Sequence, residues 1–203
     1  MLKTRIAVLV SGGGTNLQAI IDAQNSGKIS NGEVVVVIAS NSEAYALERA
    51  SKADIDGVVV TRKGATQEAF EQGIIDVLDK YKVDIIVLAG FMCILSENFT
   101  SKYPERIINV HPSLIPSFCG KGFYGLHVHE AALEYGVKVT GATVHFVNEI
   151  PDGGRIIAQK AVSIEDGDTP EVLQRRVMEQ AEWIILPEAV EKVSYDIRKS
   201  KEV

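Results

Sequence analysis

The sequence Ile6-Ala7-Val8-Leu9-Val10-Ser11-Gly12-Gly13-Gly14-Thr15-Asn16 contains an apolar run, a turn of three glycines and the start of a helix. Five consecutive apolar residues are typical of a strand that is buried on both faces of a sheet. Leu17, Ile20 and Ile21 follow the turn and fall on one helical face. This strand–turn–helix unit predicts an α/β fold.

The same alternation continues outward along the chain. Apolar runs predict further strands at residues 34–38, 57–61, 84–89 and 107–110. Helical periodicity predicts helices between strands at residues 16–23, 44–53 and 66–81. This order indicates a mostly parallel, twisted sheet with right-handed crossovers and helices on both faces.

The pattern changes after about residue 137. Two strand-like segments, residues 137–147 and 155–164, follow each other without a helix between them, which predicts an antiparallel hairpin. Thr169-Pro170-Glu171 then has the signals of a helix start, and the helix should run past Trp183 toward Pro187. No linker is visible, so we expect residues 1–203 to form a single domain with antiparallel strands in its C-terminal part.

The composition limits the class of protein. The 203 residues are 46% hydrophobic and 24% charged, with a net charge of −6, which is ordinary for a globular protein and argues against a nucleic-acid groove. No apolar run reaches the roughly 18 residues of a membrane span, and the start lacks a signal-peptide core. Cys93 and Cys119 have no metal or redox spacing, so we expect a reduced, cytoplasmic setting.

The glycine turn, Ser11–Asn16, is a candidate anion site. Glycines allow backbone N–H groups to approach an anion, and the following helix N-terminus favours negative charge. The loop lacks the lysine of a Walker loop, and Leu17 stands where a dinucleotide loop needs its third glycine. A monophosphate therefore fits better than NAD. The alternative is a tight turn with no ligand.

Asn109 and His111 lie two residues apart on a predicted strand, so their side chains point to one face. Pro112 ends the pairing and places both side chains at the strand tip. An amide and an imidazole there could perform acyl transfer, or they could simply close a strand end. Asp152 lies in a Pro-Asp-Gly-Gly turn, where aspartate is also common hairpin chemistry.

Histidines do not indicate a metal site. His127 and His129 open a predicted helix, where side chains two residues apart diverge. Neither a cysteine nor a pair of acids completes a ligand set. We therefore expect no metal.

Taken together, these motifs resemble the folate-dependent formyltransferases, and within them the phosphoribosylglycinamide formyltransferase family. The resemblance covers essentially the whole chain and rests on four segments, residues 11–16, 88–92, 109–116 and 144–154. It implies a Rossmann-like formyltransferase fold. Residues 1–100 would form the phosphate-binding half, and residues 101–203 the folate-binding and catalytic half.

The resemblance also implies roles for individual residues. Asn109, His111 and Asp152 match the catalytic trio, Gly14, Thr15 and Asn16 the binding site of the substrate phosphate, and Glu182 the contact with the ribose. The implied folate-binding residues are Gln67, Met92, Cys93, Ile94, Leu95, Asn109, Asn148, Glu149, Ile150, Pro151 and Asp152.

Three features depart from the family pattern. Cys93 stands where the family usually has arginine, and Gln67 where many members carry a basic folate contact. The loop at residues 118–124 is longer than usual. The helix before Glu182 is longer by one residue.

The implied activity is transfer of the formyl group of 10-formyltetrahydrofolate to the amine of 5-phosphoribosylglycinamide. The products would be formylglycinamide ribonucleotide and tetrahydrofolate, in de novo purine (IMP) biosynthesis. Asn109 and protonated His111 would stabilise the oxyanion, with Asp152 favouring the imidazolium and relaying a proton.

The expected partners are these two small molecules, without nucleic acid or membrane, and the protein would be a monomer or homodimer. The alternatives are a formyltetrahydrofolate hydrolase, a methionyl-tRNA formyltransferase-like enzyme and a non-catalytic nucleotide-binding module.

Overall fold

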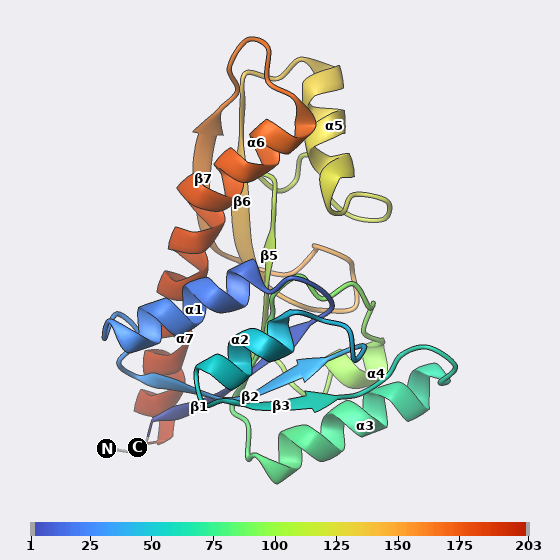
Figure 1. The fold of residues 1–203 in the computed structure, drawn as a ribbon, viewed down its shortest axis with the longest axis vertical. Coiled ribbons are helices and arrows are strands. Elements are labelled where there is room, and N and C mark those ends of the chain that lie inside the picture. The colour runs from blue at the N-terminus through green and yellow to red at the C-terminus, as the bar shows by residue number, and fades with distance from the viewer. Residues whose placement is uncertain (1–2, 202–203) are drawn as a thin grey trace.

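One sheet runs through the part of the chain that the computed structural model describes, residues 3–201 (Figure 1). Its seven strands lie in the order β3-β2-β1-β4-β5-β6-β7. Their bounds are Thr4–Val10 for β1, Gly32–Ala39 for β2, Asp56–Val59 for β3, Ile85–Leu88 for β4, Ile107–His111 for β5, Val139–Phe146 for β6 and Ile156–Ser163 for β7.

The first five strands are parallel, and β6 and β7 pair antiparallel. Both predictions are confirmed. The chain leaves β1 for β2 on one side and reaches β4 on the other, so the loops after β1 and β4 lie at a topological switch point. Ser11 N–H donates to the Gly90 carbonyl at 3.1 Å and joins these loops. Ligands of open α/β sheets bind at such a point.

Helices cover both faces of the sheet, as predicted. They are α1 (Thr15–Asn25), α2 (Ala46–Lys52), α3 (Gln67–Lys80), α4 (Glu97–Thr100), α5 (Leu126–Tyr135), α6 (Pro170–Val177) and α7 (Trp183–Lys201). Ile6, Val8 and Val10 face a core that contains apolar residues of α1, α2, α6 and α7. Ala7 and Leu9 face the core formed with α3 and α4. The continuous apolar run of β1 is therefore explained by burial on both sides.

Strands β6 and β7 extend the sheet beyond its parallel part. Figure 1 shows β6 and β7 extending upward beside α5 and α6, far from α3 at the bottom of the view. In the ladder between β5 and β6, Asn109 pairs with His145 and His111 with Thr143. This register brings a second histidine beside the predicted catalytic strand.

The long C-terminal helix extends further than predicted. It passes through Pro187 and ends at Lys201, with a π-helical turn, η1 (Met178–Glu182), between α6 and α7. A π turn accommodates one extra residue within a helix. It therefore accounts for the added residue before Glu182 without breaking the helix. Pro187 lies near the start of α7, where the burial of Leu186, Ala189 and Val190 keeps the helix on the sheet.

Candidate functional site

The glycine loop after β1 leads directly into α1. Gly14 is the N-cap residue with φ 72°, and no side chain caps the first turn of the helix. The carbonyls of Gly12 and Gly13 accept hydrogen bonds from Ala46 N–H at 3.1 Å and Arg49 Nε at 2.8 Å. The uncapped N–H groups of α1 are therefore the donors that this loop offers to an anion.

Gly14 has a second structural role. A Cβ at this position would lie 2.7 Å from the Cβ and 2.9 Å from the Cα of Ala46. A substitution would therefore displace α2 as well as alter the loop, so Gly14 variants do not isolate anion binding. Thr15 is the better probe, because its side chain is exposed at the helix start.

Glu182 lies against the loop, as the predicted ribose contact requires. Asn16 Nδ2 donates to its Oε2 at 2.7 Å, across 166 positions in sequence. Burial raises the pKa of Glu182, and the hydrogen bond from Asn16 only partly offsets this. The η1 turn places this carboxyl inward. Its contact with a ribose stays a prediction.

A cavity of about 140 Å³ opens beyond the ends of β4, β5 and β6. Nine of the predicted folate-binding residues line it, namely Cys93, Ile94, Leu95, Asn109, Asn148, Glu149, Ile150, Pro151 and Asp152. Leu88, Phe91, His145 and Val147 also line this cavity, although they were not among the predicted folate-binding residues. Its walls are apolar on one side and carry an amide, an imidazole and a carboxylate on the other.

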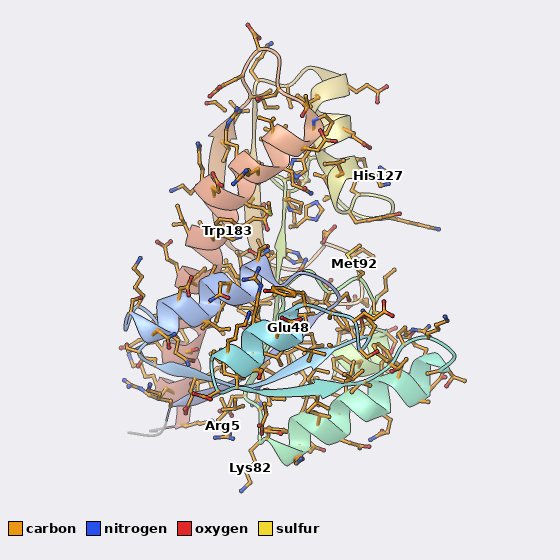
Figure 2. All side chains as sticks on the ribbon, viewed as in Figure 1. Arg5, Glu48, Lys82, Met92, His127 and Trp183 are labelled. Carbon is orange, nitrogen blue, oxygen red and sulfur yellow. The ribbon has the colours of Figure 1, made fainter. Side chains whose placement is uncertain are left out.

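Gln67 and Met92 do not line this cavity. Met92 is exposed on the loop after β4, on the same side of the molecule as His127 of α5 (Figure 2). Gln67 donates to Glu71 and to the Ile94 carbonyl, and it accepts from Arg62 Nη2 at 3.2 Å. Arg62 therefore brings a guanidinium to the corner where the family pattern has basic residues at 67 and 93. Its charge also acts on the Cys93 thiol, whose pKa burial nevertheless raises.

A larger groove of about 720 Å³ lies between α1 and α7. Thr15 and Arg49 line its end at the glycine loop, and Trp183, labelled in Figure 2, and Pro187 line it on the other helix. The groove is therefore adjacent to the candidate anion-binding loop. Asn109 and Asp152 line the smaller cavity, whereas His111 does not line it and contacts Asp152 instead.

His111 is the buried partner of Asp152. Its ring is 5% exposed, and its Nδ1 lies 3.5 Å from Asp152 Oδ2. Its Nε2 lies 2.9 Å from the Phe118 carbonyl, which can only accept, so Nε2 carries a hydrogen. Nδ1 is therefore the nitrogen that can gain or lose a proton, and it faces the carboxylate.

Burial opposes the expected protonation of His111 in the free site. Burial lowers the pKa of His111, and the raising effects of the Phe118 carbonyl and Asp152 do not overcome it. His145 lowers it further. Asp152 thus acts in the expected direction, but desolvation of the charged ring dominates. Burial thus favours the neutral imidazole in the free site, and Nδ1 of that form can accept a proton.

Asp152 stays ionised beside this ring. Burial by itself would raise its pKa, but the interaction with His145, the Gly120 N–H bond at 2.8 Å and the charge effects of both histidines hold the pKa below the usual value. Asp152 also has a left-handed backbone, with φ 56°. The Asp-Gly-Gly turn is therefore a constrained turn that aims its carboxylate into the site.

His145 orients Asn109. Its Nδ1–H donates to the Phe146 carbonyl at 2.8 Å, which leaves Nε2 facing Asn109 Nδ2 at 3.3 Å and Asp152 Oδ1 at 3.6 Å. With Nδ1 carrying a hydrogen, Nε2 can accept one amide hydrogen of Asn109, and the amide has a second hydrogen for a substrate oxygen. The sequence offered no sign of this role, because it depends on the register of β5 against β6.

The other two histidines diverge as predicted. His127 is exposed and pairs with Glu130 at 2.8 Å, whereas His129 is fully buried with no hydrogen-bond partner for either ring nitrogen. Among residues 3–201 no group of three or more His, Cys, Asp or Glu side chains has the arrangement of a metal site. No helix in this range is long and apolar enough to cross a membrane.

His129 should make the fold sensitive to acid. Burial, with a smaller effect of His111, lowers its pKa from 6.5 to about 4. Between these values the unfolded chain binds a proton that the folded chain does not, so stability falls as the pH falls. At 1.36 kcal/mol per unit, the loss from pH 7 to pH 4 is about 3 kcal/mol.

Denaturant unfolding of the parent and His129→Leu at both pH values measures this loss. The variant should lose about 3 kcal/mol less on acidification. Equal losses in the two proteins would contradict the assignment.

The fold and site define a formyl transferase: the model of the family described as "Formyl transferase" matches residues 4–190. Phosphoribosylglycinamide formyltransferase of Haemophilus influenzae is 44% identical over 90% of this chain and 84% of its own length. The crystal structure of glycinamide ribonucleotide transformylase 1 from Symbiobacterium toebii has 44% identity and a TM-score of 0.86, covering 93% of this chain and 86% of that one. The chain belongs to the phosphoribosylglycinamide formyltransferase family.

Some relatives are much longer. The bovine (Bos taurus) "Trifunctional purine biosynthetic protein adenosine-3" is 44% identical over 95% of this chain, but the chain spans only 18% of that protein.

Proposed function

We propose that this chain transfers the formyl group of 10-formyltetrahydrofolate to the amine of 5-phosphoribosylglycinamide. The products are formylglycinamide ribonucleotide and tetrahydrofolate, as in a step of de novo purine (IMP) biosynthesis. Membership of the family supports this reaction. The observation that carries it is the meeting of Asn109, His111 and Asp152 around one end of the sheet.

Each substrate has matching chemistry on the surface. The loop at Gly14, Thr15 and Asn16 offers N–H donors to a phosphate, and Glu182 lies beside it for ribose hydroxyls. The cavity beyond β4 offers an apolar wall and backbone groups to a flat pterin ring. We place the phosphate-binding half in residues 1–100 and the folate-binding and catalytic half in residues 101–203.

The reaction begins when the amine nitrogen attacks the formyl carbon. The carbonyl oxygen becomes an oxyanion, and the free amide hydrogen of Asn109 is placed to stabilise it. One such donor typically contributes about 3–4 kcal/mol to lowering a barrier. His145 keeps the amide in the donating orientation.

The attacking amine must then lose a proton. The neutral Nδ1 of His111, paired with ionised Asp152, accepts it, directly or through the carboxylate. The imidazolium formed is stabilised at 3.5 Å by Asp152. Returning the proton to the folate nitrogen lets the carbon–nitrogen bond to the folate break, so the pair acts as base and then as acid.

We also propose that the protein acts in the cytoplasm on small molecules only. No metal is needed, because the amide and the His–Asp pair supply the charge stabilisation and the proton transfer.

Formation of tetrahydrofolate, measured with and without glycinamide ribonucleotide, tests this function. We expect turnover only when the nucleotide is present, with one formyl group transferred per tetrahydrofolate released. Turnover without the nucleotide would favour a hydrolase, and formylation of methionyl-tRNA a tRNA-directed enzyme. Binding of the nucleotide without any turnover would indicate that the protein is a non-catalytic nucleotide-binding module.

Thr15→Val tests the phosphate site. The change keeps the side-chain shape and removes a hydroxyl that, within residues 3–201, makes only a long hydrogen bond of 4.0 Å to Met178 Sδ. A hydrogen bond to a charged group contributes about 1.5–3 kcal/mol, so the KM for the nucleotide should rise at least about tenfold with little change in kcat. Thr61→Val, an exposed threonine after β3, is the control. Equal KM values for both variants would remove Thr15 from the site.

A further inference from the structure

The extended loop at residues 118–124, here called the strap, touches both members of the proton-accepting pair. The Phe118 carbonyl accepts from His111 Nε2 at 2.9 Å. Gly120 N–H donates to Asp152 Oδ2 at 2.8 Å. Both contacts are made by backbone atoms, two residues apart, so the position of the strap sets them together.

The strap is held in a conformation that its residues do not prefer. Phe118 has φ 47°, a left-handed value that costs a non-glycine residue on the order of 1 kcal/mol. Gly120 and Gly122 also have positive φ, at 84° and 95°. Such a backbone persists only where its surroundings fix it, so something must hold Phe118 in place.

Two aromatic contacts do so. The Phe118 ring packs edge-on against Phe123 at 6.3 Å and against Tyr135 at 6.0 Å between ring centroids. Tyr135 is the last residue of α5, so this contact ties the strap to a helix. Its side chain is 80% exposed, and the fold itself has little need of an aromatic ring there.

We propose that Phe118, Phe123 and Tyr135 form a latch that positions the catalytic pair through the strap. The latch aims the Phe118 carbonyl at Nε2 of His111, which fixes the ring tautomer and leaves Nδ1 facing Asp152. It also holds Gly120 N–H on the carboxylate. These are positioning residues, since they act on the reaction through His111 and Asp152. The proposal rests on the proposed function for its kinetic effect, but the tautomer is a property of the free protein.

Other titratable groups surround the pair. His145 on β6 lowers the pKa of His111, and His111 in turn lowers the pKa of His129 on α5. Asp152 raises the pKa of the Cys119 thiol of the strap, as burial does. None of them belongs to the latch. A change in the latch therefore reaches the pair through the two backbone contacts and leaves these charges in place.

The test compares Phe123→Leu/Tyr135→Leu and Tyr135→Leu alone with a control, Tyr124→Leu. Tyr124 is an exposed aromatic residue of the same strap, and its ring packs against His127 and not against the latch. Formyl transfer gives kcat and KM, and ¹⁵N NMR of the ring nitrogens reports the tautomer of His111 in each protein without substrate. The signal is assigned with a His111→Asn variant.

The double variant should show a kcat about tenfold lower with an unchanged nucleotide KM, because small misplacements of reacting groups are costly. Its His111 signals should show both neutral tautomers, whereas the parent and the control show Nε2–H alone. The proposal fails if His111 has the same single tautomer in the double variant as in the control and the two proteins have the same kcat. If the parent transfers no formyl group, the proposed function fails, and the NMR comparison still decides the role of the latch. Because Tyr135 is exposed, Tyr135→Leu alone should fold, and it allows the same kinetic and NMR comparison if the double variant does not fold.

Discussion

Replacing Asp152 with asparagine is expected to lower kcat by about 10³-fold, with the nucleotide KM changed only slightly. Proton transfer by a positioned group contributes about 10²–10⁴-fold. The amide keeps the size of the carboxyl and can still accept from Gly120 N–H. Its oxygen carries no full charge, so once Nδ1 of His111 gains a proton, the imidazolium loses the carboxylate that stabilises it at 3.5 Å.

Steady-state kinetics of Asp152→Asn and of Asp166→Asn measure this effect. Asp166 is the matched control, because its carboxylate is fully exposed in the loop after β7. The control should retain the parent kcat, and both variants should unfold at the parent temperature. A parental kcat in Asp152→Asn would exclude the carboxylate from proton transfer.

Gly154→Ala is expected to destabilise the fold by about 3 kcal/mol and to lower kcat as well. An added Cβ would lie 1.7 Å from the Phe146 carbonyl oxygen and 2.6 Å from its carbon. Both are backbone atoms of β6, next to the ladder bond from Phe146 N–H to the Arg155 carbonyl. The strand or the turn must move, and Asp152 lies two residues away.

Gly153→Ala is the control that separates the clash with the Phe146 backbone from the effect of adding any side chain to this turn. There the Cβ would lie 2.6 Å from Cγ2 and 2.7 Å from Cβ of Ile150, a residue of the same exposed turn, so the turn can shift without moving β6. Denaturant unfolding of the two variants should therefore show a larger loss for Gly154→Ala than for Gly153→Ala. Similar losses would contradict the steric explanation.

Local patterns predicted most of the fold. The apolar run at Ile6–Val10 and the helical face of Leu17, Ile20 and Ile21 are buried as expected, because burial of one face requires those periods. The hairpin also followed from two strand-like segments with no helix between them. The end of the last helix was misjudged, because Pro187 usually disrupts a helix interior, whereas here a buried face and a π turn carry the helix onward.

The site was predictable where a motif concentrates its residues and unpredictable where distant segments meet. Asn109, His111 and Asp152 converge as predicted. His145 and Arg62 reach the site only through strand register and loop conformation, which no local pattern encodes. The lowering of the His111 pKa by burial could not be predicted, because burial is invisible in the sequence, whereas the raising effect of Asp152 was predicted.

A crystal structure of the chain with glycinamide ribonucleotide and a formyl-folate analogue that cannot transfer its acyl group would test the account most directly. We expect the acyl carbon in the cavity beyond β4, with its oxygen within hydrogen-bond distance of Asn109 Nδ2 and the substrate amine beside Asp152. The phosphate should lie on the N–H groups that follow Gly14. An acyl group bound instead in the larger groove between α1 and α7, away from all three side chains, would contradict the account.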